Sequence, residues 1–353
     1  MATRWLRRIG SKHSGFRYVD DTGRTLRDRR TLERIDAMRV PPAWREVHIA
    51  ATTRSKIQAW GFDVRGRKQY RYHGRAVERR ELRKYYRMRQ LAKALPRMRR
   101  ILHDDASRRD LSRSTVAATV LRLISESFCR VGGERYAREN GTYGITTLRK
   151  SHVVIERDHV ILKYLGKGNK NQRQTVVGHD LTRLVARQLR TPGARLFRFR
   201  TPHGGWCDLT ARDVNNYVHD RLGPHYSAKD FRTWGGTLRA ATVLAELGPP
   251  RTPTEAKRNV ALAMRLVSTE LGNTATICRK SYVHPIVVAR YVDDGEVIPL
   301  PRARRAALDR GQAHSPEERA LIAFLDRHFP ERRRKPRAER EADARGRAER
   351  SAA

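Results

Sequence analysis

The sequence has few cysteines, few acidic residues and no long apolar run. Its 353 residues include three cysteines, Cys129, Cys207 and Cys278, which lie far apart and lack the Cys-x-x-Cys or Cys/His spacing of a metal site. We expect them to be free thiols in a reducing compartment. No stretch of about eighteen apolar residues is present, which argues against a membrane-spanning helix. The N-terminal MATRWLRRIGSK has charge but no apolar core after it, so no secretory signal is expected there.

Basic residues outnumber acidic ones by two to one. The chain has 76 Lys and Arg against 37 Asp and Glu, which gives a formal net charge of +39. A charge of this size predicts a polyanionic partner. The absence of a strongly amphipathic basic helix favours nucleic acid over a membrane surface. We therefore expect a nucleic-acid-binding protein that acts inside the cell, in the cytoplasm and on the nucleoid.

The order of the patterns predicts an α+β fold, with a small strand-rich N-terminal domain and a mainly helical second domain. Over residues 1–76, FRYVDDTGRTL predicts a hairpin turning at Asp21-Thr22-Gly23, and VHIA and KIQAWGFDVRGRKQYRYHG predict further strands. Tyr70 and Tyr72 share one face by the two-residue period. The second domain is expected over 77–302, and a basic C-terminal extension over 303–353.

Helical spacing dominates the second domain. Apolar residues from Val116 to Phe128 form one stripe, which Gly132-Gly133 is expected to end. Residues 152–178 predict a three-strand β-meander with turns at 157–159 and 167–171. The remainder to about Arg290 is expected to be helical, with Thr210 as an N-cap and a helix that ends at Gly272. In the extension, SPEERALIAFLDRHF predicts one short helix that docks on the body, and the tail beyond Pro330 is expected to be disordered.

The scarcity of carboxylates bears on catalysis. Enzymes that cut phosphodiesters usually hold divalent metals with clustered carboxylates, and no such cluster accompanies the basic segments. Without metals, fixed cations and hydrogen-bond donors must meet the charge on the phosphoryl oxygens, and arginine is suited to this. The nucleophile would then have to be a side chain, for which tyrosine is one option. Asn273 and Tyr282 are nine residues apart, so one straight helix would place them ~180° apart. If both contact one phosphate, the segment must bend or Asn273 must lie outside the helix.

Five segments together resemble the type IB DNA topoisomerases, the small bacterial and poxvirus-like enzymes above all. In chain order they are GRKQYRYHG, CRVGGERYARENGTYGITTLRKSHV, KYLGKGNKNQRQ, KDFRTWGGTLRA and LGNTATICRKSYVHP. The resemblance spans roughly residues 15 to 290. It implies an ATP- and metal-independent isomerase without cofactors that relaxes supercoils through a 3′-phosphotyrosyl intermediate. It also implies a monomer that clamps duplex DNA, with no membrane and no obligate protein partner.

The resemblance assigns a role to each matching residue. Tyr282 falls on the nucleophile, Arg130 and Arg232 fall on the two transition-state arginines, and Lys167 falls on the lysine that protonates the leaving 5′-oxygen. Asn273 stands where poxvirus and eukaryotic members have histidine, and an amide NH₂ can make the same donation to a phosphate oxygen.

Each assignment has a structural alternative. Arg130 could complement a helix dipole, Lys167 could be a solvated turn lysine, and Arg232 could form an ion pair on a helix surface. Asn273 could be an ordinary helix cap, and Tyr282 a half-buried helical tyrosine.

Further residues are expected to hold the duplex. They are Arg67, Tyr70, Tyr72 and Arg80 in the N-terminal part and Tyr136 in the catalytic part. The alternative for the N-terminal set is a polar strand face with sheet-forming aromatics.

Two other functions compete with a topoisomerase. A tyrosine recombinase shares this chemistry and suits GKGNKNQR, but recombinases usually carry histidine where this chain has Lys229, and they have a helical domain where strands are expected here. A non-enzymatic DNA-packaging protein would suit the charge alone, and it predicts that Tyr282 is dispensable.

Overall fold

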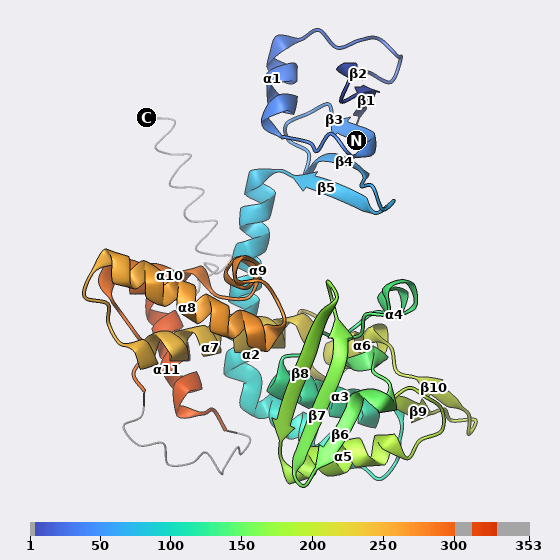
Figure 1. Cartoon of the computed structure of the whole chain (residues 1–353), viewed down its shortest axis with the longest axis vertical. Helices are drawn as coiled ribbons and strands as arrows, with labels where there is room; N and C mark the ends of the chain where they lie inside the picture. The colour runs from blue at the N-terminus through green and yellow to red at the C-terminus, as the bar shows by residue number, and fades with distance from the viewer. Residues whose placement is uncertain (1–3, 301–312, 330–353) are drawn as a thin grey trace, which may run out of the picture. The chain divides into compact units, whose positions relative to one another are not determined.

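The computed structural model describes residues 4–300 and 313–329. The chain divides into two compact units, Met1–Lys84 (unit 1) and Tyr85–Ala353 (unit 2). Unit 1 is built on a five-strand sheet, and unit 2 is mainly helical with a three-strand sheet (Figure 1). The α+β prediction is therefore confirmed.

Unit 1 is an antiparallel sheet with strand order β2-β1-β3-β4-β5. The strands are β1 (Trp5–Ser11), β2 (Gly15–Val19), β3 (Arg45–Ala50), β4 (Ile57–Phe62) and β5 (Lys68–Tyr72). Helix α1 (Arg29–Ala37) begins at Asp28, whose carboxylate accepts from the Thr31 backbone N–H at 3.0 Å. Ile35 of α1 packs against Leu6, Val47, Ile49 and Ala59, which alternate with more exposed residues along their strands.

The first hairpin turns earlier than the sequence predicted. Strands β1 and β2 pair from Arg7↔Val19 to Ser11↔Gly15, so residues 12–14 make the turn. The expected turn at Asp21–Gly23 is also present, but it closes only a single bridge between Val19 and Thr25. The Asp20 carboxylate holds this turn by accepting from the Thr22 and Arg24 backbone N–H groups.

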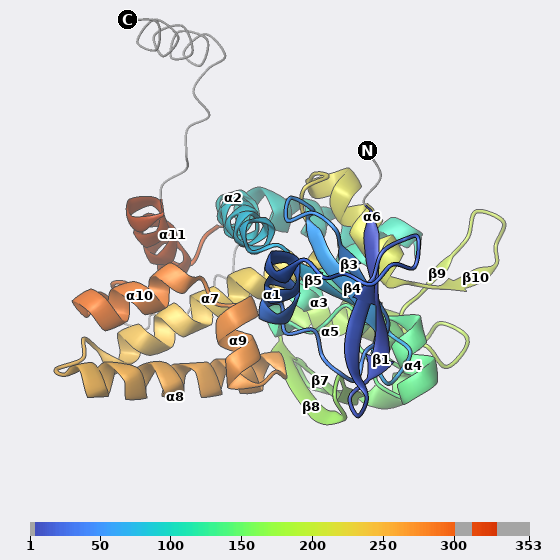
Figure 2. The ribbon, with the colours of Figure 1, turned by 90° about the horizontal axis from the view of Figure 1, so that it is seen from above.

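The helices of unit 2 enclose one large apolar core. Helix α2 (Gly74–Ser107) begins in unit 1 and ends in unit 2. The others are α3 (Arg113–Ser127), α4 (Glu134–Asn140), α5 (His179–Leu189), α6 (Ala211–Leu222), α7 (Ala228–Leu247), α8 (Pro253–Leu271), α9 (Ala275–Ser281), α10 (Pro285–Asp294) and α11 (Pro316–His328). Helices α7, α8 and α10 pack together on one side of this unit (Figures 1 and 2). No helix among residues 4–300 and 313–329 is both long and apolar enough to cross a membrane.

The three-strand meander is confirmed. Its strands β6 (Val153–Glu156), β7 (His159–Gly166) and β8 (Lys170–Val177) pair antiparallel in chain order. The turns occupy residues 157–158 and 167–169, and Arg157 and Asn169 adopt positive φ within them. The long β7–β8 hairpin is the element that carries Lys167.

Two predictions for unit 2 were wrong. Helix α3 ends at Ser127, because Phe128 adopts a left-handed conformation (φ 51°) and caps it, so Gly132-Gly133 is not its end. The chain from the meander to Arg290 is also not wholly helical, since β9 (Arg198–Arg200) and β10 (Trp206–Asp208) form a short hairpin. The predicted caps at Thr210 and Gly272 are confirmed.

The predicted helix after the catalytic segments docks on unit 2. The carboxylate of Glu318 in α11 is buried and accepts from Arg99 at 2.7 and 3.0 Å and from the Trp234 indole at 3.4 Å. Trp234 lies on α7, so this contact braces the helix that carries Arg232. The expected disorder beyond Pro330 concerns residues outside those described.

Candidate active site

The chain bends at Asn273, between α8 and α9, and α9 ends at Tyr282. Gly272 ends α8 in a left-handed conformation (φ 62°), and Thr274 caps α9 by accepting from the Ile277 backbone N–H. Asn273 therefore lies between two helices, and Tyr282 is the residue that ends the second one. The expectation that Asn273 stands outside the helix is confirmed.

Arg130 reaches this bend from the loop after α3. Its Nη1 donates to the Gly272 carbonyl at 3.0 Å, and its Nη2 donates to Oδ1 of Asn273. Burial, followed by the charge of Arg232, lowers the pKa of Arg130, although a guanidinium stays protonated. Arg130 stands beyond the end of α3, so it does not act as a helix-end residue.

The backbone around Arg130 is held by close contacts within its own loop. The Arg130 carbonyl accepts from the Ile145 N–H at 2.8 Å. Gly144 packs directly on Gly132: a Cβ atom at Gly144 would lie 2.5 Å from the Gly132 Cα. This close contact explains why residue 132, which the sequence suggested as part of a helix end, is a glycine.

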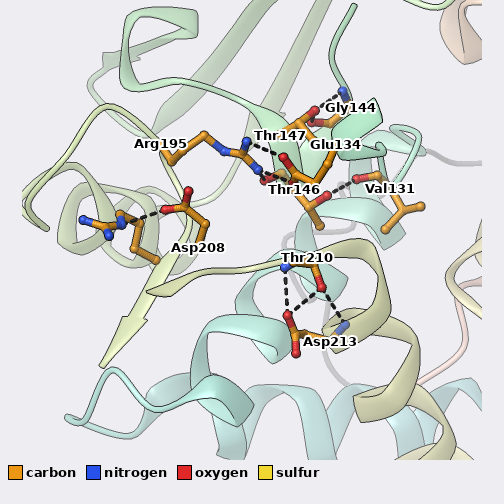
Figure 3. Close-up of polar contacts among 10 residues, drawn as sticks. Val131, Glu134, Gly144, Thr146, Thr147, Arg195, Asp208, Thr210 and Asp213 are labelled. Carbon is orange, nitrogen blue, oxygen red and sulfur yellow. Dashed lines mark hydrogen bonds and ion pairs between the residues drawn. The ribbon is translucent and has the colours of Figure 1, made fainter. Parts of the chain in front are cut away.

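Side chains secure the same loop from outside. Figure 3 shows Arg195 reaching Glu134 and the Thr146 carbonyl, with distances of 2.6 and 2.9 Å to the Glu134 oxygens and 2.9 Å to Thr146. The Thr146 hydroxyl donates to the Val131 carbonyl at 2.7 Å. The two segments of the loop that carries Arg130 are therefore hydrogen-bonded to each other.

Arg232 approaches Tyr282 from α7. Its side chain is 3% exposed, and its Nη2 donates to the Leu271 carbonyl at 2.9 Å. The guanidinium carbon lies 5.0 Å from the centroid of the Tyr282 ring. The alternative of a helix-surface ion pair is therefore wrong for Arg232.

Two adjacent glycines let α7 pack closely, Gly236 against the backbone of Tyr282 and Gly235 against Phe128. A Cβ at Gly236 would lie 3.0 Å from the Tyr282 carbonyl oxygen, and one at Gly235 would lie 2.1 Å from the Phe128 ring. The next residue, Thr237, donates to the Tyr282 carbonyl at 3.1 Å. The backbone of Tyr282 is therefore fixed against the helix that carries Arg232.

Two tyrosines stand near the same arginines but differ in acidity. Burial raises the pKa of Tyr282, but the charges of Arg232 and Arg130, a hydrogen bond from Arg232 and the charge of Lys229 together lower it below the usual tyrosine value. Burial and the neighbouring Cys129 raise the pKa of Tyr164 instead. Of the two, only Tyr282 is shifted toward the reactive phenolate.

Two buried donors in this cluster lack an acceptor. Among the described residues, Nε of Arg232 and Nδ2 of Asn273 have no hydrogen-bond partner. Buried polar groups are nearly always paired, so such groups call for an explanation. Both are N–H donors beside Tyr282 or Arg130, so an oxygen acceptor would satisfy them.

Lys167 is not brought into this cluster. It is exposed in the β7–β8 turn, and no hydrogen bond or ion pair within 4–300 and 313–329 involves it. The role of Lys167 as proton donor therefore stays a prediction.

The residues predicted to hold DNA fall into two groups. In unit 1, Tyr70 and Tyr72 are 41% and 42% exposed on one face of β5, with ring centroids 5.9 Å apart, and Arg80 lies 5.2 Å from the Tyr72 ring. Arg67 instead pairs with Asp63 at 2.7 Å, and its hydrogen bond lowers the pKa of Asp63 to about 2. In unit 2, Tyr136 is 53% exposed on α4.

Comparison with known proteins identifies the family. Residues 67–297 match the family described as eukaryotic DNA topoisomerase I, catalytic core, and residues 15–63 match the bacterial DNA topoisomerase IB N-terminal domain. The chain is 32% identical over 272 residues to DNA topoisomerase 1B of Acanthamoeba polyphaga mimivirus, covering 75% of this chain and 81% of that protein. The chain belongs to the type IB DNA topoisomerases. It is thus an enzyme that relaxes DNA.

More distant relatives agree with this assignment. DNA topoisomerase 1B of vaccinia virus (strain Copenhagen) is 22% identical over 238 residues, covering 66% of this chain and 72% of that protein. A solved XerH site-specific recombinase bound to its difH substrate aligns with a TM-score of 0.34 at 15% identity, covering 53% of this chain and 47% of that one. A likeness this weak carries no argument for the recombinase alternative. The packaging-protein alternative is excluded by the family.

One lysine of this topoisomerase site escaped the sequence analysis. Lys170 donates from Nζ to the Asn273 carbonyl at 2.9 Å. It stands three residues after Lys167 in the same basic turn, and nothing in the local sequence distinguishes the two. Only the tertiary contact between β8 and the α8–α9 bend separates their environments.

Within the part of the chain that the structure describes, no group of three or more His, Cys, Asp and Glu side chains is arranged to hold a metal ion. The charged groups that surround Tyr282 are Arg130, Arg232 and Lys229. The electrostatics of the site are therefore cationic.

Proposed function

We propose that this topoisomerase cleaves one DNA strand by direct attack of Tyr282 on the scissile phosphorus. A bond forms between the Tyr282 oxygen and phosphorus, and the bond from phosphorus to the 5′-oxygen breaks, which leaves a 3′-phosphotyrosyl link. The phenolic proton passes to solvent, and the departing 5′-oxygen takes a proton from Lys167. After strand rotation the reverse reaction reseals the strand, so the protein is unchanged and no energy source is needed.

The oxyanion is assigned to Arg130, Arg232 and Asn273. Their donors are prearranged: Arg130 binds Gly272 and Asn273, and Arg232 binds Leu271, so all three are tied to one stretch of main chain. Fixed donors that need no reorganisation are the most effective stabilisers of a charged transition state. Two of them offer a buried N–H without an acceptor, and a phosphate oxygen would satisfy both.

The placement of Tyr282 is the observation that carries the proposal: the Arg232 guanidinium carbon lies 5.0 Å from its ring centroid, and Nε of Arg232 is a buried donor without an acceptor among the described residues. A phenol near its usual pKa is a weak nucleophile at neutral pH, and the nearby cations shift Tyr282 in the productive direction despite burial. Tyr164, near the same arginines, is shifted the other way. The electrostatics therefore favour one tyrosine over the other.

Relaxation without cofactors tests the proposed mechanism. Purified protein mixed with negatively or positively supercoiled plasmid in EDTA, without ATP, should relax both, because arginines and an amide meet the phosphoryl charge. Agarose gels of time points measure the result. Activity that disappears in EDTA and returns with Mg²⁺ would refute the metal-free mechanism, and resolved strand exchange between two duplexes would indicate a recombinase.

We also propose that Tyr70, Tyr72 and Arg80 contact the duplex from unit 1. Replacing both tyrosines with alanine should weaken DNA binding about 10-fold or more, since exposed aromatic rings beside a cation suit stacking and phosphate contact. Val64→Ala, an exposed residue of the preceding turn, is the matched control. Filter binding over a salt series measures affinity. Unchanged affinity in the double variant would mean that these tyrosines only stabilise the sheet and do not contact DNA.

A further inference from the structure

One face of β8 carries three long polar side chains. Lys170, Gln172 and Gln174 alternate along the strand, so they project to the same side of the β7–β8 hairpin. Val176, the next residue of this series, is buried in the core, which identifies the face as the one turned toward the body of unit 2.

All three side chains meet the end of α8. Gln174 donates from Nε2 to the Glu270 carbonyl at 2.8 Å, and Lys170 donates from Nζ to the Asn273 carbonyl at 2.9 Å. The end of α8 lies beside β8 in both views of the ribbon (Figures 1 and 2). The Glu270 carbonyl belongs to the last turn of α8, where carbonyls lack intrahelical donors, and the Asn273 carbonyl lies in the bend that follows. The two contacts therefore hold both the helix end and the bend.

Gln172 fills the space between the two outer contacts. It is 9% exposed and is held between two glycines, one on each element. A Cβ at Gly166 would lie 2.7 Å from its Cγ, and a Cβ at Gly272 would lie 2.0 Å from its Oε1. The missing side chains at Gly166 and Gly272 therefore allow the hairpin to pack closely against the bend.

The contact ends where the exposed tip begins. Gly166 pairs with Lys170, and the tip between them comprises Lys167, Gly168 and Asn169. Gly168 and Asn169 both adopt positive φ, at 76° and 56°. Lys170 is thus the last residue anchored to the body before the tip that carries Lys167.

We propose that Lys170 is a positioning residue that fixes Lys167 relative to Asn273. Together with Gln172 and Gln174, Lys170 joins the hairpin to the α8–α9 bend. The positions of the proton donor and the oxyanion donors are therefore fixed relative to one another. The proposal rests on the proposed function, in which Lys167 protonates the 5′-oxygen. A proton donor displaced by about 1 Å can lose a large part of its effect, so this anchor should be visible in the cleavage rate.

The test uses two suicide substrates that differ in one atom. In the first the bridging 5′ atom of the scissile phosphate is oxygen, and in the second it is sulfur. A thiolate leaving group, with a conjugate-acid pKa of about 8.5, needs little protonation, so a defect in proton donation disappears on the sulfur substrate. Lys167→Ala is the reference, and it should be slow on oxygen and restored on sulfur.

Lys170→Met should follow the same pattern with a smaller effect. Single-turnover cleavage at saturating enzyme should slow about 10-fold on the oxygen substrate and return close to the wild-type rate on sulfur. Lys170→Arg, which can still reach a carbonyl, should keep most of the rate. In the Lys167→Ala background, Lys170→Met should add no further loss, because residues that act through one group are not additive. Lys163→Met, which removes a lysine from the opposite face of β7, should behave as wild type.

The outcomes separate the two proposals. If Lys167→Ala stays slow on sulfur, the role of Lys167 in the proposed function is wrong. If Lys167→Ala is restored but Lys170→Met is slow on both substrates, or its effect multiplies that of Lys167→Ala, the positioning role is wrong and Lys170 acts independently. A wild-type rate for Lys170→Met on oxygen overturns the inference as well.

Discussion

Tyr282→Phe should abolish relaxation while leaving DNA binding intact. The substitution keeps the ring, which lies against the Arg232 guanidinium, and removes only the oxygen that is proposed to attack phosphorus. Loss of a nucleophile typically costs roughly 10⁴-fold or more, so no relaxation is expected over hours. Plasmid relaxation, filter binding and trapping of the covalent protein–DNA adduct with denaturant measure the three properties separately.

Tyr164→Phe is the matched control for this experiment. Its hydroxyl donates to the Cys129 thiol at 3.4 Å, and it stands close enough to feel the charges of Arg130 and Arg232. Because burial raises its pKa, we expect its removal to leave relaxation and adduct formation within a few-fold of wild type. If Tyr282→Phe forms a covalent adduct and Tyr164→Phe does not, then Tyr164 is the nucleophile.

The sequence predicted most of the fold because its local signals agree with the tertiary structure. The β7–β8 hairpin has two-residue alternation and a Gly-Asn turn, and α8 has a threonine cap, a clear apolar stripe and a terminal glycine. The prediction of the α3 terminus was wrong because a tertiary contact determines where this helix ends. Phe128 adopts a left-handed conformation that its residue type disfavours, and its ring packs on Gly235 of α7, which no local pattern reveals.

The sequence analysis named four residues that the fold brings together, Arg130, Arg232, Asn273 and Tyr282, but it predicted neither their contacts nor the separate position of Lys167. The nine-residue spacing of Asn273 and Tyr282 required a bend, and Gly272 with the Thr274 cap supplies it. Arg130 and Arg232 each donate to a backbone carbonyl, which lies over a hundred residues away for Arg130 and about forty for Arg232, and carbonyls carry no sequence signal. The same limit applies to Lys170, whose acceptor is the main chain of Asn273.

Arg232→Ala should slow cleavage by more than about 10³-fold, because this side chain is proposed to serve two steps. Loss of one oxyanion donor costs roughly 10²–10³-fold. The substitution also removes the first of the charges that lower the pKa of Tyr282, so less phenolate is present at neutral pH. Arg232→Lys should recover only part of the rate, since an ammonium cannot bind Leu271 and a phosphate oxygen with one planar fork.

The pH dependence of cleavage distinguishes these effects from a general loss of structure. Cations hold the pKa of Tyr282 below its usual value, so the wild-type rate should rise with pH and level off below pH ~10. In Arg232→Ala the rise should move to higher pH, and the 5′-sulfur substrate should give no recovery because the defect is not in proton donation. Arg239→Ala, which removes a half-buried arginine of α7 paired with Glu270 at 2.8 Å, should keep the wild-type profile. A thermal unfolding midpoint for Arg232→Ala within a few degrees of wild type would tie its slow rate to the site. An unshifted pH profile would mean that Arg232 stabilises the oxyanion without activating Tyr282.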